Sequence, residues 1–202
     1  MTFRSQEDPR DPSATRRVWE QLSEEIRSCQ KCPLHATRTQ AVVYRGSLSP
    51  RLLFVGEAPG AAEDRVGRPF VGRSGQRLDA AVAHLGLSES DYGVLNLLKC
   101  RPPENRFDRA AARTCRPYLD RQIELLSPPV TVTLGSPALH ALAPEAPAML
   151  QAAGSPRKWE HGALFPLIHP AAALRSRRLA DRWTHDIDAL GRWLAGSPAQ
   201  PV

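Results

Sequence analysis

The sequence contains little lysine and no long apolar run. Only Lys31, Lys99 and Lys158 are lysines, so arginine supplies nearly all of the 27 basic side chains. No apolar run approaches the roughly 20 residues that a helix needs to cross a bilayer. The first 13 residues, MTFRSQEDPRDPS, lack the apolar segment of a secretory signal. These absences exclude a membrane-spanning protein and predict an intracellular one.

The balance of charge is positive. The chain has 202 residues, a net charge of +6 and a hydrophobic content of 42%, with a sequence pI of about 9.6. These values are typical of one globular domain with a real core. Because guanidinium groups pair bidentately with phosphate, the arginine content favours a polyanionic partner. The alternative is the codon bias of a GC-rich genome, and charge alone does not decide between them.

Cysteine is also scarce, but its spacing is informative. Cys29 and Cys32 form a C-x2-C pair, and Cys100 and Cys115 form a second, wider pair. In an intracellular chain, four cysteines indicate metal or cluster ligation rather than disulfides. Zinc and iron–sulfur both fit this spacing, and four unrelated buried thiols are the remaining alternative.

The most informative stretch is residues 52–76. An apolar run over 52–55 stops at Gly56-Glu57-Ala58-Pro59-Gly60, as in a buried parallel strand that opens into a loop. The segment 68–76 then places Phe70 before a basic, glycine-spaced turn. A carboxylate, a ring for stacking and a phosphate-sized turn together indicate a binding site for a nucleotide or a flipped base. The turn is not a P-loop, because it lacks the lysine and lies ten residues beyond the strand.

Strands and helices alternate along the chain. Helices are expected from Thr15 to about 28 and over 74–86, 109–126 (interrupted or bent near Pro117) and 179–194. Strands are expected over 52–55, 94–98, 129–135 and 164–168. A short strand at 41–44 and a loop or poorly formed helix over 144–158 complete the pattern. This alternation predicts a parallel sheet covered by helices on both faces. It predicts a single domain over 15–196, with tails at 1–14 and 197–202.

Three polar residues belong to the ends of different strands. Glu57 follows the strand at 52–55, Asn96 lies in the strand at 94–98, and His169 follows the strand at 164–168. Because the carboxyl ends of parallel strands lie at one edge of a sheet, we expect the three side chains to converge there. Each residue alone has an ordinary structural explanation. Their shared position predicts an enzyme.

Four motifs and the four cysteines together resemble the family-four uracil-DNA glycosylases, the iron–sulfur branch of their superfamily. The motifs are GEAPG at 56–60, GRPFVGRSGQ at 67–76, NLLKCRPPENR at 96–106, and HPA at 169–171 with Leu174-Arg175. The resemblance runs from about Cys29 to Arg175. It implies a three-layer α/β/α fold with a central four-stranded parallel sheet. It also implies excision of uracil from DNA and a 4Fe–4S cluster on Cys29, Cys32, Cys100 and Cys115.

The resemblance also implies roles for individual residues. Glu57, Asn96 and His169 would be catalytic, and Gly56, Ala58 and Phe70 would join them around the uracil. DNA contacts would come from Arg73, Ser74, Arg101, Leu174 and Arg175. No histidine lies between Cys100 and Cys115, so we expect ordinary turnover rather than covalent trapping of uracil.

One competing hypothesis keeps the same fold. In it, the chain is a non-catalytic module that binds damaged or uracil-containing DNA with a steep salt dependence. The presence of Glu57, Asn96 and His169 together argues against this alternative. The expected form is a monomer without a membrane partner. It would act on double- or single-stranded DNA that contains uracil, in the nucleoid of a prokaryotic cytoplasm.

Overall fold

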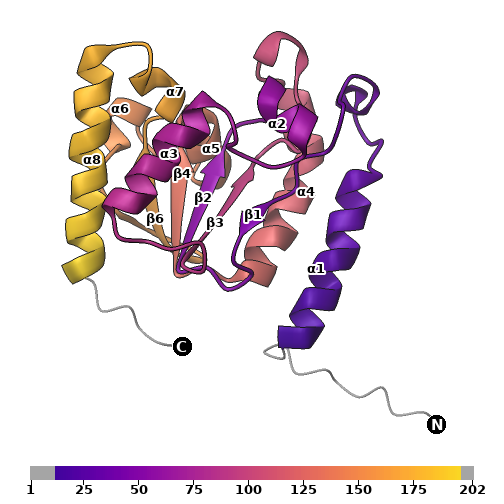
Figure 1. Cartoon of the computed structure of the whole chain (residues 1–202), viewed down its shortest axis with the longest axis horizontal. Coiled ribbons are helices and arrows are strands. Elements are labelled where there is room, and N and C mark those ends of the chain that lie inside the picture. Colours follow the sequence, from indigo (N-terminus) through magenta and orange to yellow (C-terminus); the bar gives the residue numbers. More distant parts are fainter. Residues whose placement is uncertain (1–11, 197–202) are drawn as a thin grey trace.

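The central element is a six-stranded sheet with the strand order β1-β3-β2-β4-β6-β5 (Figure 1). The computed structural model describes residues 12–196. The four inner strands are parallel and the two edge strands are antiparallel to their neighbours. The strands are β1 (Arg45–Gly46), β2 (Leu52–Gly56), β3 (Tyr92–Asn96), β4 (Val130–Leu134), β5 (Arg157–Trp159) and β6 (Gly162–Leu167). The predicted four-stranded parallel sheet is confirmed, with one short strand added at each edge.

Helices cover both faces of this sheet. The α-helices are α1 (Pro12–Arg27), α2 (Ala61–Val66), α3 (Arg73–His84), α4 (Arg109–Leu126), α5 (Ser136–Leu142), α6 (Met149–Ala152), α7 (Pro170–Ala173) and α8 (Arg177–Gly196). Two 3-10 helices, η1 (Pro33–Ala36) and η2 (Pro103–Asn105), lie in the loops. None of the helices within residues 12–196 is long and apolar enough to cross a membrane.

The core is divided into two main layers by the sheet. On one face, Phe54 and Val94 pack with Leu78 of α3 and Trp183 of α8. On the other face, alternate strand residues such as Leu53 and Leu95 pack with Leu119 of α4 and Leu139 of α5. β2, β3 and β4 are buried along their whole length, which explains why their sequences read as short apolar runs. The three-layer α/β/α prediction is therefore confirmed.

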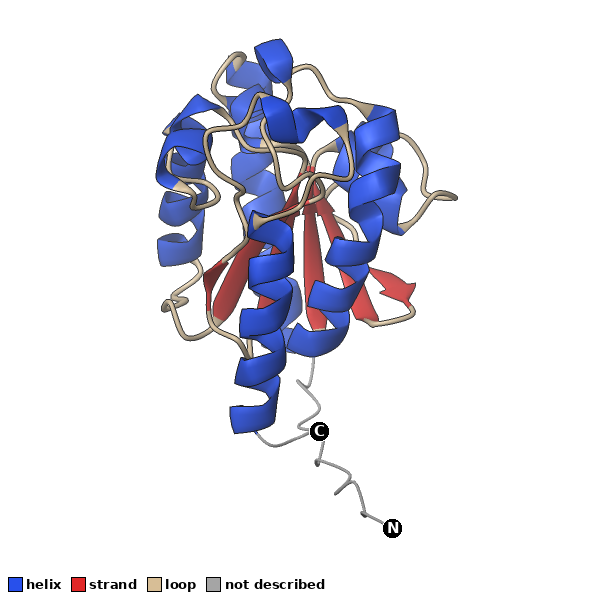
Figure 2. Cartoon of the chain, turned by 90° about the vertical axis from the view of Figure 1, so that its right-hand side faces the viewer, coloured by secondary structure: helices blue, strands red, loops and turns tan. Residues whose placement is uncertain are grey.

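The carboxyl ends of the parallel strands open into a layer of loops and short helices (Figures 1 and 2). β2 and β3 pair in register from Leu52 opposite Tyr92 to Gly56 opposite Asn96. The apolar run after Asn96 continues beyond the strand, because the Leu97 and Leu98 N–H groups bond to the Gly56 and Glu57 carbonyls at 2.9 and 3.0 Å. The third parallel strand of the site, β6, is separated from β2 by β4.

Several predicted boundaries were wrong. The first helix begins at Pro12 instead of Thr15, so three residues of the predicted tail are helical. The edge strand forms at 45–46 and not at 41–44. Gly72, and not Ser74, occupies the N-cap of α3. Pro117 does not interrupt α4, so that part of the prediction was wrong, and a bend at Pro117 stays a prediction. The segment 144–158 contains α6 and the start of β5. Residues 1–11 and the tail at 197–202 lie outside the described residues.

Candidate active site

The buried amide of Asn96 marks the centre of the site. The Asn96 residue is 1% exposed, and neither its Oδ1 nor its Nδ2 atom has a hydrogen-bond partner among residues 12–196. A Cβ atom added to Gly56 would lie 2.4 Å from Asn96 Oδ1 and 2.6 Å from Phe70 Cε2. Glycine is therefore required at the end of β2, because the amide and the ring both lie against its backbone. An unpaired buried amide is costly to the fold and typical of a position kept for a ligand.

Phe70 is held in a strained backbone conformation. Its φ is +55°, in the left-handed region that a bulky residue rarely adopts. A Cβ atom on Gly75 would lie 1.8 Å from the Phe70 carbonyl oxygen, so the start of α3 packs directly on this backbone. Arg45 donates to the same carbonyl at 3.3 Å and to Asp79 at 2.6 Å. These contacts fix the ring at the edge of the sheet.

Glu63 connects the two loops of the site, and the sequence interpretation did not include it. Its carboxylate accepts the Gly60 N–H at 3.1 Å, the Val71 N–H at 2.9 Å and the Gly72 N–H at 2.8 Å. The loop after β2 is thereby tied to the turn that carries Phe70. The sequence does carry a signal for this contact, because Glu63 stands three residues after Gly60, which is the capping-box position relative to an N-cap. No helix was predicted directly after the loop at 56–60, so neither α2 nor its capping interaction was expected.

His169 joins the site from β6. Its ring centroid lies 5.9 Å from that of Phe70, with the two planes inclined by 34°. The Ala171 N–H donates to His169 Nδ1 at 3.1 Å, so the neutral imidazole carries its proton on Nε2. Burial, followed by the nearby charge of Arg175, lowers the pKa of His169 to about 4. The ring is thus a neutral donor at physiological pH.

Glu57 lies on the loop directly after Gly56. Its side chain is half-buried, and burial raises the pKa of its carboxyl group. No hydrogen bond to this carboxylate occurs among residues 12–196, while its main-chain carbonyl accepts the Leu98 N–H. The structure therefore brings Asn96 and Phe70 together at Gly56 and His169 close to Phe70, with Glu57 at the same edge of the sheet.

The predicted DNA contacts surround the same edge. Arg73 and Ser74 are the first residues of α3, and Leu174 and Arg175 directly follow α7. Leu174 is one of four large hydrophobic residues described as exposed, at 39%. Part of the Arg101 guanidinium group already has a hydrogen-bond partner, because its Nε donates to Asn105 Oδ1 at 2.9 Å.

The four cysteines line a single small cavity between α1, η1 and α4. Cationic and N–H groups face the sulfur atoms: Arg38 donates to Cys100 Sγ at 3.1 Å, and the Lys31 N–H donates to Cys29 Sγ at 3.5 Å. Burial raises the pKa of the Cys100 and Cys115 thiols. Within the described residues, no three potential ligands converge as they would on a single metal ion. Four thiols that line one cavity are nevertheless the kind of donor set found in zinc and iron–sulfur sites.

Lys99 connects this cavity to the active site. The residue is 1% exposed, its Nζ donates to the Asn96 carbonyl at 2.6 Å, and it also lines the cysteine cavity. Desolvation by burial lowers the pKa of its ammonium group to about 8, partly offset by the nearby Cys115. The ammonium group is therefore bonded to the backbone of Asn96.

The comparisons with known proteins agree with this arrangement. A model of the uracil DNA glycosylase superfamily matches residues 43–188, and this span includes every element that contributes to the site except the first cysteine pair. The fold and the site thus define a member of that superfamily.

Three relatives narrow the assignment. The type-4 uracil-DNA glycosylase of Thermotoga maritima is 40% identical, with 79% of this chain and 85% of the relative aligned. That of Saccharolobus solfataricus is 40% identical over 76% of each chain. That of Archaeoglobus fulgidus is 36% identical, covering 83% of this chain and 88% of the relative. This chain belongs to the type-4 uracil-DNA glycosylase family.

Proposed function

We propose that this protein is a monofunctional DNA-repair hydrolase that cleaves the N-glycosidic bond of uracil in DNA. The products are free uracil and an abasic site. The observation that carries the proposal is the Asn96 amide, buried and unpaired beside a stacking ring and a neutral imidazole. An extruded base brings the hydrogen-bonding groups that this amide lacks.

Asn96 provides the selection of uracil. Its Nδ2 group donates to the uracil O4 atom and its Oδ1 atom accepts the uracil N3–H. Cytosine presents the reverse pattern at these positions and would leave both amide atoms mismatched. Phe70 stacks on the face of the base, and the glycine at position 56 lets the Asn96 amide and the Phe70 ring lie side by side against the backbone.

His169 stabilises the departing base. As the bond to the sugar breaks, negative charge develops on the uracil O2 atom, and the Nε2–H of a neutral imidazole donates to it. The Ala58 N–H is positioned by sequence as a second donor at the start of the loop. Removal of one such donor costs about 3 kcal/mol of transition-state stabilisation in comparable sites.

Glu57 acts on the sugar side of the bond. The developing sugar cation needs a nearby carboxylate and a water molecule for the attack. Because burial raises the pKa of Glu57, its carboxylate is a stronger base than one in free solution. We therefore assign Glu57 to positioning and deprotonating the attacking water. The alternative, a wall against the 5-methyl group of thymine, predicts that Glu57→Gln keeps uracil release and still excludes thymine, whereas Glu57→Ala begins to accept thymine.

The four cysteines are assigned to a 4Fe–4S cluster. When bound, the cluster acts as a structural tie between the segment after α1, the segment after β3, and α4. Arg38 and Lys99 supply positive charge beside the thiolates. Cys115→Ala should lose iron and the broad visible absorbance of the protein, measured in freshly purified samples. Full iron content in this variant would contradict the assignment.

The substrate is uracil-containing DNA, held at the edge by Arg73, Ser74, Arg101 and Arg175. Leu174 is exposed enough to enter the gap left by the flipped base. The expected form is a monomer in the nucleoid of a prokaryotic cytoplasm.

A uracil-release assay under single-turnover conditions tests the whole proposal. Asn96→Ala and His169→Ala should each lower the rate constant about 10²- to 10³-fold, while Arg192→Ala on the far end of α8 serves as the control. No strand cleavage and no protein–DNA adduct on a denaturing gel are expected. Tight binding of uracil DNA without any release, unchanged by either variant, would instead establish the non-catalytic module.

A further inference from the structure

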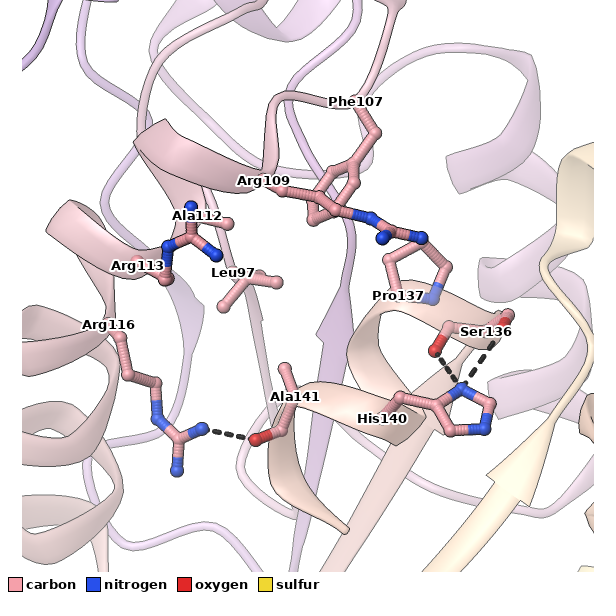
Figure 3. Close-up of a pocket in the computed structure, with 10 residues that line it drawn as sticks. All are labelled: Leu97, Phe107, Arg109, Ala112, Arg113, Arg116, Ser136, Pro137, His140 and Ala141. Carbon is pink, nitrogen blue, oxygen red and sulfur yellow. Dashed lines mark hydrogen bonds between the residues drawn. The ribbon is translucent and has the colours of Figure 1, made fainter. Parts of the chain in front are cut away.

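A second hollow lies beside the proposed uracil site, on the opposite face of the sheet. It has a volume of about 480 Å³ and lies between α4 and α5 (Figure 3). Leu97 forms part of its lining and directly follows Asn96, and Ser136 follows Gly135, whose backbone packs on His169. Because Leu97 packs with the α4 side of the core and Phe70 with the α3 side, the edge of the sheet separates the two sites.

The floor of this hollow is apolar and its rim is cationic. Leu97, Ala112, Pro137 and Ala141 line it together with the half-buried ring of Phe107. Figure 3 shows the Arg109 side chain extending from α4 toward Ser136 and Pro137, with Arg113 beside Leu97. Both arginines are exposed, and neither guanidinium has an ion-pair or hydrogen-bond partner within residues 12–196.

The other polar side chains that line the hollow bond to groups within the protein. Arg116 pairs with Asp120 at 2.5 Å and donates to the Ala141 carbonyl, which ties α4 to the end of α5. His140 Nδ1 lies 2.9 Å from the Ser136 carbonyl and 3.1 Å from its hydroxyl. The two free charges at the rim are therefore those of Arg109 and Arg113.

The hollow continues as a longer trough. An adjoining hollow of about 660 Å³ is lined by the segment 103–108 and shares Phe107, Arg109 and Arg113 with the first. In this segment Glu104 and Asn105 have positive φ, and Arg106 is paired with Glu104 at 3.0 Å. The trough therefore runs past the start of α4, with its unpaired cations at its centre.

We propose that this trough, formed by Phe107, Arg109, Arg113, Leu97 and Pro137, binds the single strand that continues from the extruded uridine. The inference rests on the proposed function, because it assumes a uracil-containing strand at the neighbouring site. Arg109 and Arg113 contact successive phosphates, and Phe107 stacks with an unpaired base. A strand that crosses the edge of the sheet places uracil on the α3 face and the next nucleotides on the α4 face.

The chemistry of the trough favours nucleic acid over other occupants. An apolar floor with an aromatic ring and unpaired guanidinium groups is the combination that single-stranded nucleic acid requires. Its volume lies in the range of about 300–1,000 Å³ typical of small-ligand sites, so at least one nucleotide can enter. An acidic peptide would satisfy the arginines but would leave the aromatic floor without a planar partner.

Salt-dependent binding measures the phosphate contacts directly. The probe is a single-stranded oligonucleotide with one non-hydrolysable 2′-fluoro-deoxyuridine, and the readout is fluorescence anisotropy with the full-length protein between about 50 and 200 mM salt. Each lost phosphate contact reduces the slope of log K against log salt by about 0.7 for a single strand. Arg109→Ala/Arg113→Ala should therefore reduce the slope by about 1.4 and weaken binding at low salt.

Two further variants distinguish binding at the trough from a general effect of the net positive charge. Arg16→Ala/Arg192→Ala removes the same charge from the exposed first turns of α1 and last turns of α8, at the far end of the molecule (Figure 1). This control should leave the slope unchanged. Phe107→Leu keeps an apolar side chain but loses the aromatic face, so affinity should fall severalfold with an unaltered slope.

The outcomes are distinguishable. Equal slopes for wild type and the Arg109/Arg113 variant, or equal loss in the control, would overturn the trough. If the slope falls as expected but wild-type protein releases no uracil, the trough stands and the glycosylase proposal fails. If uracil is released normally and the slope is unchanged, the glycosylase stands and the trough fails.

Discussion

Protonation of His169 should make the folded protein less stable in mild acid. Burial holds the pKa of this imidazole at about 4 in the folded chain, against 6.5 in the unfolded chain. Between these values the unfolded state binds a proton that the folded state does not, so stability rises with pH. The stabilising contribution is complete above about pH 6.5 and is lost as pH falls toward 4.

The magnitude follows from the size of the shift. The pKa falls from 6.5 to about 4, and at about 1.4 kcal/mol for each pKa unit this corresponds to about 3.5 kcal/mol in total. About 3 kcal/mol of this is lost by pH 4, where the folded-state imidazole is half protonated. Arg175 contributes to the lowered pKa and Glu63 opposes it, while burial is the largest cause. The variant His169→Gln cannot titrate and should lack this component.

Two measurements check the reasoning. Urea unfolding of wild type and His169→Gln from pH 4 to 8 should give a stability difference that changes by about 3 kcal/mol across the range, because other titrating groups cancel. An NMR titration of the His169 ring should show a midpoint near 4. A midpoint near 6.5, or parallel stability profiles for the two proteins, would refute the buried neutral donor and with it the proposed contact to uracil O2.

Three other substitutions test the support of the site. Gly75→Ala drives a methyl group into the Phe70 carbonyl. The free energy of unfolding, measured in urea, should fall by about 2 kcal/mol or more, and uracil release should be strongly reduced. Wild-type behaviour would show that the turn relaxes freely. Glu63→Gln weakens the three N–H contacts between the loops, so kcat/KM should fall at least tenfold with folded circular dichroism retained; an unchanged kcat/KM would remove Glu63 from the site. Asp108→Ala removes the N-cap of α4, whose side chain accepts the Ala110 and Ala111 N–H groups at 2.8 and 2.9 Å. It should lower the free energy of unfolding by about 1 kcal/mol without altering kcat. A loss of kcat at full stability would contradict that purely structural role.

The sequence by itself determined the layers and the chemistry. Short apolar runs at 52–55, 94–98, 129–135 and 164–168 are long enough for strands and too short for helices, so the parallel core could be predicted. The polar residues at their ends, Glu57, Asn96 and His169, could be placed at one edge because parallel strands share a direction. The motifs around them are specific enough to indicate the family.

Only the tertiary structure decided how that edge is built. Local pattern cannot show that Glu63 bonds three N–H groups from two loops, or that Gly75 forces close packing on Phe70, because both depend on segments that meet in space. The donor tautomer of His169 required the Ala171 N–H at 3.1 Å. The unpaired state of the Asn96 amide required its complete surroundings. Sequence fixes which groups a chain can present, whereas distance, burial and hydrogen-bond partners arise only when remote segments pack against each other.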